Sequence, residues 1–267
     1  MDVTDRFKAG KRQFRLRTLI AIGTVLAIGL GILAKSAKRA NDKAVAASAL
    51  TSMGSTVWWD VDLRARTHSP LILWLAKSCG KQYFSDVTNA SLVDATDEHL
   101  KHIAVLGGIT RLTIKARRVT PEGIREIRRL TKLKSLVLMG PGIGDGELAE
   151  LPEFPRLDHL ELHGTDVAGP GFENLRRQPR LREIYLDDPD FNDDCIQYLT
   201  GLSQVTWIVF QGSSVSQQGA EQLFASHPDR TVCVGSSSAG NTSDTFYYFT
   251  FTPRDGYQWL RDPSDVQ

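Results

Sequence analysis

The strongest constraint on how this chain can fold is a repeat with a period of 24 residues. Apolar residues recur at this spacing over five units without an insertion, in columns such as Leu112, Leu136, Leu160, Ile184, Ile208 and Ile114, Leu138, Leu162, Leu186, Phe210. The two columns are two positions apart, which is the spacing of inward side chains on a strand. Further along each unit, apolar residues three and four positions apart are typical of a helix. One unit cannot bury its apolar face alone, so the five are expected to stack around a shared core.

Polar residues mark where the helices of these units begin. Thr120, Asn192 and Ser216 each stand just before a helical stretch and are predicted to be N-caps. Each unit is therefore strand, turn, helix and return. The fold predicted from this order is an α/β solenoid, with parallel strands on the concave face and helices on the convex face.

The segment from Leu160 to Leu175, LELHGTDVAGPGFENL, resembles the bacterial leucine-rich repeats of the form L-x-L-x-G-T-x-V-T-D-x-G-L. The resemblance covers the repeat core and is looser at the ends, and it implies a leucine-rich-repeat solenoid. The apolar segment near the N-terminus is also similar to the anchors of N-terminally anchored members. This chain departs from the family at the position of the asparagine ladder, which is occupied by Arg117, Pro141, Thr165, Pro189 and Ser213. Only Thr165 and Ser213 supply a hydroxyl, so we expect water to complete the hydrogen bonds of the turn backbone.

An uncharged stretch of seventeen residues lies at positions 18–34 (TLIAIGTVLAIGLGILA). As a helix it would be about 25 Å long, at the short end of what crosses a bilayer. Six Lys and Arg precede it and four follow within residues 1–43, which favours a cytoplasmic N-terminus with the repeat domain on the outer side. We therefore expect one transmembrane helix. A signal peptide cleaved at Ala34-Lys35-Ser36 is the alternative.

Three small residues in this stretch, Gly23, Ala27 and Gly31, follow one another at four-residue spacing along one helix face. Small residues at this spacing let two membrane helices approach closely. A homodimer through the transmembrane helix is one interpretation, and the ordinary abundance of Gly and Ala in such helices is the other.

Six parts are expected along the chain: a basic cytoplasmic segment (1–17), the transmembrane helix (18–34), a juxtamembrane helical linker (35–54), an N-terminal cap with a degenerate first repeat (55–109), the leucine-rich repeats with a terminal strand (110–235), and a Ser/Gly-rich linker with a C-terminal tail (236–267). In the cap we expect a strand over residues 56–62, a helix over 71–78, and aromatic side chains that shield the open end of the first repeat, namely Trp58, Trp59, Trp74, Tyr83 and Phe84. The aromatic run at 246–251 is expected to pair with the edge of the last strand, ahead of a floppy remainder.

The repeat register also predicts which side chains face outward from the strands. Residues 24 apart lie on neighbouring strands, so three columns cover the concave face, which is the usual binding surface of a solenoid. The charge along it runs from basic to acidic, with aromatic residues of the kind that dominate binding energies. The predicted partner-binding residues are Arg111, Lys115, Val137, Met139, His159, Glu161, His163, Glu183, Tyr185, Asp187 and Trp207.

The run His159-x-Glu161-x-His163 suggests a metal site at first sight. Along one strand the two histidines are about 13 Å apart, too far to share an ion. A lateral pair of His163 with Asp187 remains an alternative, but no fourth ligand is evident, and pairing of histidines with carboxylates is preferred. We expect no metal and no cofactor.

Catalysis and nucleic-acid binding find little support. Neither a phosphate-binding glycine loop nor a G-x-S-x-G or H-E-x-x-H motif occurs. Cys195 takes a helix position held elsewhere by glycine and is predicted to pack, whereas Cys233 continues the central concave column and is expected to be exposed. Residues 44–267 carry 22 basic and 28 acidic side chains, a balance that argues against nucleic acid as a partner.

The function predicted from these features is non-catalytic binding of a protein partner of unknown identity through the concave face. A passive envelope scaffold or spacer without a specific ligand is the alternative. Similar repeats also serve as substrate-recognition arms in F-box ubiquitin-ligase proteins, although no F-box-like segment precedes the repeats here. A convex basic patch around Arg125, Arg128 and Arg129 is a competing surface, with a solvated helix face as its ordinary explanation.

Overall fold

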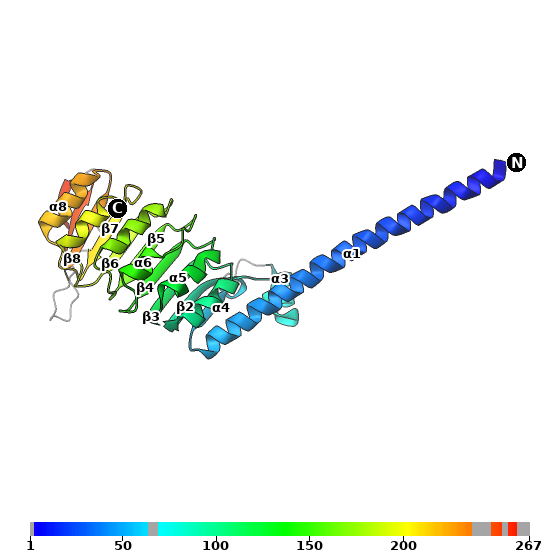
Figure 1. The fold of residues 1–267 in the computed structure, drawn as a ribbon, viewed down its shortest axis with the longest axis horizontal. Helices are drawn as coiled ribbons and strands as arrows, with labels where there is room; N and C mark the ends of the chain where they lie inside the picture. Colours follow the sequence, from blue (N-terminus) through cyan, green and yellow to red (C-terminus); the bar gives the residue numbers. More distant parts are fainter. Residues whose placement is uncertain (1–2, 64–68, 237–246, 253–255, 261–267) are drawn as a thin grey trace.

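The structure is a computed structural model that describes residues 3–63, 69–236, 247–252 and 256–260 (Figure 1). Within these residues ten strands form one sheet in sequence order. Strands β2 to β8 are parallel, and β1, β9 and β10 extend the sheet antiparallel. The strands are β1 Thr56–Trp59, β2 Val87–Thr96, β3 Arg111–Arg118, β4 Ser135–Met139, β5 His159–His163, β6 Glu183–Asp187, β7 Trp207–Gln211, β8 Thr231–Ser236, β9 Tyr247–Thr252 and β10 Gly256–Leu260. The chain is thus an α/β protein with a mostly parallel sheet, as predicted.

A long helix precedes the sheet, and short helices or 3₁₀ turns connect the parallel strands. These elements are α1 Val3–Ser52, α2 Asp60–Leu63, α3 Pro70–Cys79, η1 Lys81–Tyr83, α4 Asp97–Val105, α5 Pro121–Glu126, η2 Ile127–Arg129, α6 Asp145–Ala149, η3 Pro170–Arg177, η4 Asp193–Cys195, α7 Ile196–Leu199 and α8 Gln217–Ser226. The predicted N-caps are confirmed: the side chains of Thr120, Asn192 and Ser216 each accept a backbone N–H of the following turn.

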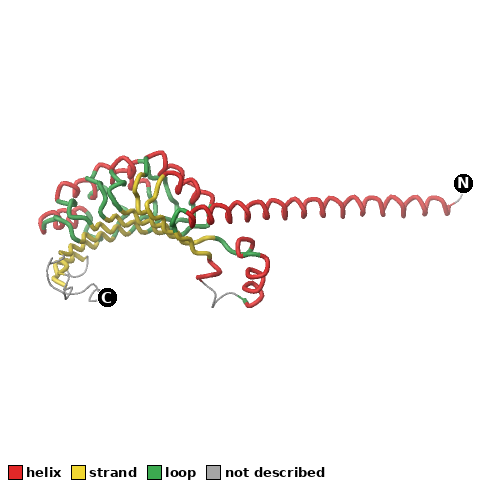
Figure 2. The backbone as a smooth tube through the Cα atoms, turned by 90° about the horizontal axis from the view of Figure 1, so that it is seen from below, coloured by secondary structure: helices red, strands yellow, loops and turns green. Residues whose placement is uncertain are grey.

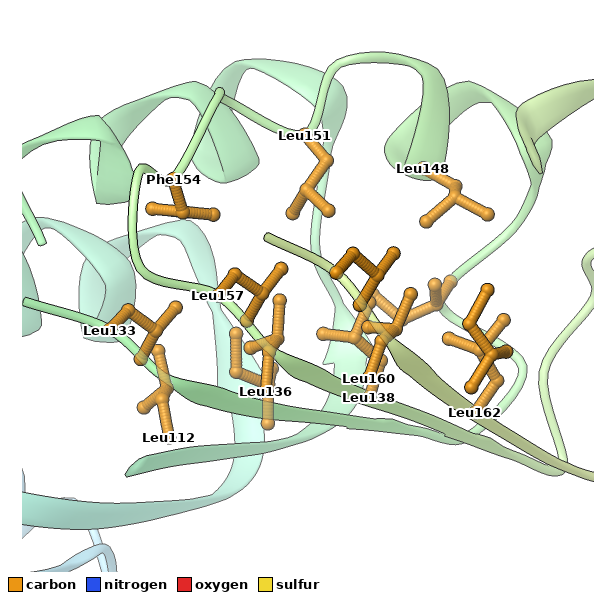
Figure 3. Packing of buried hydrophobic residues seen from close by; sticks show 14 of the residues in the cluster. Leu112, Leu133, Leu136, Leu138, Leu148, Leu151, Phe154, Leu157, Leu160 and Leu162 are labelled. Carbon is orange, nitrogen blue, oxygen red and sulfur yellow. The ribbon is translucent and has the colours of Figure 1, made fainter. Parts of the chain in front are cut away.

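The sheet and the connections form two curved layers, with the strands on the inner side and the helices and turns on the outer side (Figure 2). The core lies between them. Leu136, Leu138, Leu160 and Leu162 point from the strands toward Leu148 and other residues of the connections (Figure 3). All of these side chains are buried in one continuous cluster that runs from α1 to β8.

From β3 to β8, neighbouring strands pair residues that are 24 positions apart, whereas β2 and β3 pair Ala90 with Leu112 and Leu92 with Ile114, which are 22 apart. The ladder along the first apolar column is Leu112, Leu136, Leu160, Ile184, Ile208 and Val232. The spacing read from the apolar columns is therefore the register of the sheet. Since β2 also pairs in parallel with β3 from Asn89 onward, the weak unit before the first clear repeat still forms a strand.

The helices of the connections are short, and one connection has none. Helix α6 has five residues, and the β5–β6 connection contains no α-helix but the 3₁₀ segment η3. Gly169, Pro170 and Gly171 at its start have low helix propensity, and a 24-residue unit leaves few residues for a full helix. The predicted order of strand, turn, helix and return is thus found in the units that hold an α-helix, but between β5 and β6 a 3₁₀ segment takes the place of the helix.

In every second unit, an aspartate at the start of the connection accepts hydrogen bonds from the next unit and lies against a glycine there. Asp145 accepts hydrogen bonds from the backbone N–H groups of Gly169 and Gly171, at 3.1 and 2.8 Å. Asp97 and Asp193, which lie 48 residues before and after it, accept the N–H groups of Thr120 and Ser216 in the same way. A Cβ at Gly171 would lie 2.9 Å from the Asp145 carboxylate and 3.0 Å from the backbone of Asp145. The glycines at 123, 171 and 219 therefore make room for the carboxylate of the preceding unit.

Gly171→Ala is accordingly expected to lower the free energy of unfolding by about 1–3 kcal/mol, because a backbone atom must shift to admit the methyl group. Gly146→Ala is the matched control, since the nearest atom to its added Cβ is 3.9 Å away and the residue lies in helix α6. The control should be neutral or slightly stabilising. Urea denaturation followed by circular dichroism compares the two, and equal midpoints would contradict the role assigned to Asp145.

Side chains of the return segments donate to carbonyls of the preceding unit. Asn174 donates to the carbonyls of Leu148 and Leu151, and Gln178 to that of Pro152. The hydroxyls of Thr165 and Ser213, where the family resemblance places a ladder, are buried and have no hydrogen-bond partner among the residues that the structure describes. These side chains thus add contacts between units to those made by the aspartates, and a role for water beside the two hydroxyls stays a prediction.

Arg230, 1% exposed, closes the C-terminal end of the stack from within. Its guanidinium donates to the carbonyls of Val205, Leu199 and Leu202, at 3.0, 3.4 and 2.5 Å. Burial lowers the pKa of Arg230 to about 10. The guanidinium therefore satisfies the carbonyl of the last residue of helix α7, Leu199, and two carbonyls of the segment that follows it.

The N-terminal cap differs from the prediction in two respects. The strand ends at Trp59 and the chain turns into α2, whereas the helix α3 is confirmed. Of the five aromatic residues expected to shield the first repeat, Trp59 is buried, while the side chains of Trp58, Trp74, Tyr83 and Phe84 are exposed. The open end is covered instead by the last turns of α1, where Ala46, Ala47 and Leu50 join the core. The C-terminal part of the predicted helical linker at 35–54 is therefore helical and also packs into the core.

At the C-terminal end, β9 pairs antiparallel with β8, as expected for the aromatic run. The remainder is not all floppy, because β10 adds a further strand beside β9. Cys233 is buried, against the expectation of exposure, and pairs across the sheet with Thr250. The linker at 237–246 and the tail at 261–267 lie outside the described residues.

No helix in the described part of the chain combines the length and hydropathy that a membrane crossing requires. Helix α1 nevertheless runs unbroken from Val3 to Ser52. Ala27 is exposed on it, and a Cβ at Gly31 would meet no atom within 4 Å. The side-chain surroundings of Gly23 lie outside what the structure describes, so packing through these three residues stays a prediction.

Candidate functional site

The strands place all eleven predicted partner-binding residues on one face of the sheet. The register aligns Arg111, Ser135, His159, Glu183 and Trp207 in one column and Lys115, Met139, His163, Asp187 and Gln211 in another, with Thr113, Val137, Glu161, Tyr185 and Val209 between them. Buried leucines alternate with these residues along β4 and β5, so the columns point away from the core. This is the concave face in Figure 2.

A chain of hydrogen bonds joins two histidines and three carboxylates at the centre of this face. Glu161 bridges the two rings, with His159 Nε2 at 2.5 Å from Oε1 and His163 Nε2 at 3.0 Å from Oε2. The other ring nitrogens contact the next strand, where His159 Nδ1 lies 3.0 Å from Glu183 and His163 Nδ1 lies 3.2 Å from Asp187. We call these five residues the histidine–carboxylate chain.

An imidazolium donates from both ring nitrogens, whereas a neutral ring donates from one. His159 faces a carboxylate oxygen at each nitrogen, so this geometry favours its charged form. Burial alone would lower the pKa of His159, but the hydrogen bonds and charges of Glu161 and Glu183 outweigh it, and the pKa is raised above 6.5. Burial likewise opposes the ionisation of Glu161, yet the hydrogen bonds from His163 and His159 lower its pKa below 4.5.

These pKa shifts predict how the free energy of unfolding of the protein depends on pH. The contribution of His159 is present in full below pH 6.5 and is lost as pH rises through its raised pKa, while that of Glu161 is present above pH 4.5 and is lost as pH falls through its lowered pKa. The histidine–carboxylate chain should therefore stabilise the fold most between these values. In NMR titrations, Glu161→Gln should lower the pKa of His159, whereas Glu173→Gln on the outer layer should not. An unchanged titration of His159 would contradict the arrangement.

Beside the histidine–carboxylate chain, the concave face is hollowed over β3 to β5. The depression has a volume of about 530 Å³ and is lined by the predicted residues Arg111, Val137, His159 and Glu161 together with Ser135. Thr110, Lys134 and Asp158 also line it and were missed from the sequence. They form a column one residue before the first concave column, so the same 24-residue spacing would have found them.

Aromatic and basic residues lie on either side of the histidine–carboxylate chain. The ring of Tyr185 is 5.8 Å from that of His163, and Trp207 is 41% exposed on the next strand along. Arg111 and Lys115 lie two strands away on β3, both exposed, and form no ion pair with the described residues. Along the concave face, the basic residues of β3 are thus followed by the depression, then by the histidines and carboxylates of β5 and β6, and finally by Trp207 on β7.

On the convex side, the basic patch is partly neutralised. Arg125 Nε contacts Glu150 of the next unit at 2.7 Å, and its Nη1 lies 3.5 Å from Glu122. These ion pairs agree with the interpretation of a solvated helix face. They make this patch a weaker candidate for binding than the concave face.

Metal binding and cysteine chemistry have no clear location in the part of the chain that the structure describes. No group of three or more His, Cys, Asp or Glu side chains there has the arrangement to hold a metal ion. Cys195 is buried, in line with its predicted packing role, and burial raises the pKa of its thiol to about 12. A thiol of this kind is a poor nucleophile.

No protein-family model matches the chain, and no curated protein is similar enough to it to count as a match. The assignment of function therefore rests on the geometry of the site and on the sequence resemblance.

Proposed function

We propose that the chain is a membrane-anchored leucine-rich-repeat protein that binds a protein partner through its concave face and has no catalytic activity. The observation that carries the proposal is the ordered concave surface, on which three columns of side chains combine a hollow, a charge gradient and exposed aromatic area. Such a surface orients a partner by charge and supplies apolar contact area at the same time.

The membrane anchor is supported by helix α1. Its stretch at 18–34 has no charged residue, and the large apolar side chains described there are exposed: Ile20 is 58%, Ile28 64%, Leu30 66%, Ile32 62% and Leu33 66% exposed. The described protein does not cover them, and a lipid bilayer would. The basic residues on both sides favour a cytoplasmic N-terminus with the repeats on the outer side.

An uncleaved anchor predicts that full-length chain stays with carbonate-washed membranes, because a spanning helix is removed by detergent and not by alkali. Recovery of a soluble form that begins near Lys38 would instead support the signal-peptide alternative. Mass spectrometry of the membrane and soluble fractions decides between them, with an integral and a peripheral membrane protein of the same cells as controls.

The test of binding is a comparison of partners captured by the detergent-solubilised full chain and by Tyr185→Ala/Trp207→Ala. If the two aromatic residues are hot spots, each truncation costs about 2 kcal/mol, and the pair should raise the Kd of the partner by about a thousandfold. Gln197→Ala/Gln222→Ala on the exposed outer layer is the matched control. Equal capture by all three would favour a spacer without a specific ligand.

A further inference from the structure

Charge is distributed unequally between the two long edges of the repeat stack. The return segments that lead into β4, β5 and β6, residues 128–134, 152–158 and 176–182, hold nine Lys and Arg and two acids. The turns that follow the same strands, residues 140–147, 164–171 and 188–195, hold seven acids and no Lys or Arg. We call the first set the basic edge and the second the acidic edge.

Helix α1 leaves the molecule at the basic edge. Its last turns lie near the later part of β2, where Val93 N donates to Ser55 just after the helix. Nearer its N-terminus, Lys43 forms an ion pair with Asp86, directly before β2 begins, and Lys132 of the basic edge lies 3.7 Å from the same carboxylate. The strands therefore begin on the side toward which α1 runs to its N-terminus, as Figure 1 shows for the helix.

We propose that the basic edge docks on anionic lipid headgroups, so that the repeats lie along the surface of the membrane that α1 enters. This inference rests on the proposed anchor. The sign of the charge suits a leaflet that contains anionic lipid, because such lipids attract basic segments close to the bilayer, and the acidic edge faces away from it.

The cationic groups of the basic edge are available for headgroups. Lys134, Arg156, Arg180 and Arg182 are exposed and form no ion pair with the described residues. Lys134, Arg156 and Arg180 line one open depression of about 410 Å³ together with Pro155 and Asp158. Guanidinium groups bind phosphate in a bidentate manner, so a depression with two of them suits a phospholipid headgroup.

The distance between the basic edge and the membrane surface also allows this docking. Residues 35–43 separate Lys43 from the end of the uncharged stretch by about 14 Å of helix. Headgroups fill about 5–7 Å of this. The remaining gap is close to the Debye length of about 8 Å at physiological salt, so the basic edge lies within electrostatic reach of the lipid.

The cap adds aromatic side chains on the same side. Helix α3 and η1 lead directly into the start of β2, and Figure 2 shows this segment beside α1, beyond the end of the sheet. Leu71, Trp74, Tyr83 and Phe84 are exposed there. Trp and Tyr are the residues most enriched at membrane interfaces, so their exposure, unexplained by the fold, is accounted for by the same docking.

The test measures which edge of the stack lies nearer to lipid. Ser203 and Ser214 are both exposed and flank β7, the first at the edge where the strands begin and the second at the edge where they end. Each is replaced by Cys in a Cys79→Ser background, since Cys79 is exposed and Cys195 and Cys233 are buried. The full chain, labelled with a donor dye, is reconstituted into phosphatidylcholine vesicles with or without phosphatidylglycerol, which carry an acceptor dye on a headgroup.

Energy transfer from position 203 should exceed that from 214 in vesicles with phosphatidylglycerol. The difference should disappear in phosphatidylcholine alone and at about 1 M salt, where the Debye length is about 3 Å. It should also disappear in Lys134→Glu/Arg156→Glu/Arg180→Glu/Arg182→Glu. It should persist in Arg111→Glu/Lys115→Glu/Arg117→Glu/Arg118→Glu, which changes net charge equally elsewhere.

Equal transfer from the two positions, or a difference that ignores lipid charge, would overturn the docking. A chain that does not stay with the vesicles would overturn the anchor and the docking together. Partner capture by the concave face is measured separately in detergent, so failure of the docking is distinguishable from failure of the proposed binding function.

Discussion

Leu162→Asp is expected to lower the free energy of unfolding by more than about 4 kcal/mol, enough to unfold a domain of ordinary stability. The Leu162 side chain is 0% exposed and lies in the ladder between Leu138 and Leu186. An aspartate there would bury a charge without a partner. Because the core is continuous from α1 to β8, the loss should spread through the whole stack. Urea denaturation monitored by circular dichroism measures it.

Val209→Asp is the matched control for this substitution. Val209 is also a strand residue, but it lies in the central concave column and is only partly buried. The same new charge can be solvated there, so the expected change is below about 1 kcal/mol. A Leu162→Asp chain with the denaturation midpoint of the unmodified protein would show that the 24-residue register is wrong.

Arg230→Met is expected to be the next most damaging change, at about 3–5 kcal/mol. Methionine fills much of the same space but leaves the carbonyls of Val205, Leu199 and Leu202 without this donor inside the protein. Arg230→Lys should recover only part of the loss, because one ammonium cannot reproduce the fork of the guanidinium.

Arg182→Met serves as the control for Arg230→Met. Arg182 stands 48 residues earlier, at the same position of its unit, and is exposed. Its replacement should change the free energy of unfolding by less than about 0.5 kcal/mol. If thermal denaturation showed the two substitutions to be equally mild, the buried guanidinium would not be closing the end of the stack.

The parts of the fold that depend on periodicity were predictable from sequence. A strand residue contacts its counterpart in the next unit, so Leu112, Leu136 and Leu160 reveal the register directly, and the outward columns follow from it. The hydrogen bonds of Asp97, Asp145 and Asp193, which recur every 48 residues, were missed. Asp145 and its partner Gly171 differ in chemistry and are 26 positions apart, so a comparison at an offset of 24 does not pair them.

Features that occur once were harder to predict. The aromatic residues of the cap look like core residues by type, yet Trp74 and Tyr83 are exposed because α1 already covers the open end. Arg230 looks like a surface residue, and its burial depends on three carbonyls that a sequence does not display. In the site, the columns were predicted, but the bridging of both histidines by Glu161 depends on side-chain rotamers.

The most direct test of the central claim compares charge reversal on the two faces. Glu183→Lys/Asp187→Lys alters the concave face, and Arg125→Glu/Arg128→Glu alters the convex face, with both pairs exposed or partly exposed. The measurement is the Kd of each variant for a partner captured by the unmodified chain. Binding through the concave face predicts a much larger rise in Kd for the first pair. A larger rise for the second pair would move the interface to the convex face and contradict the proposal.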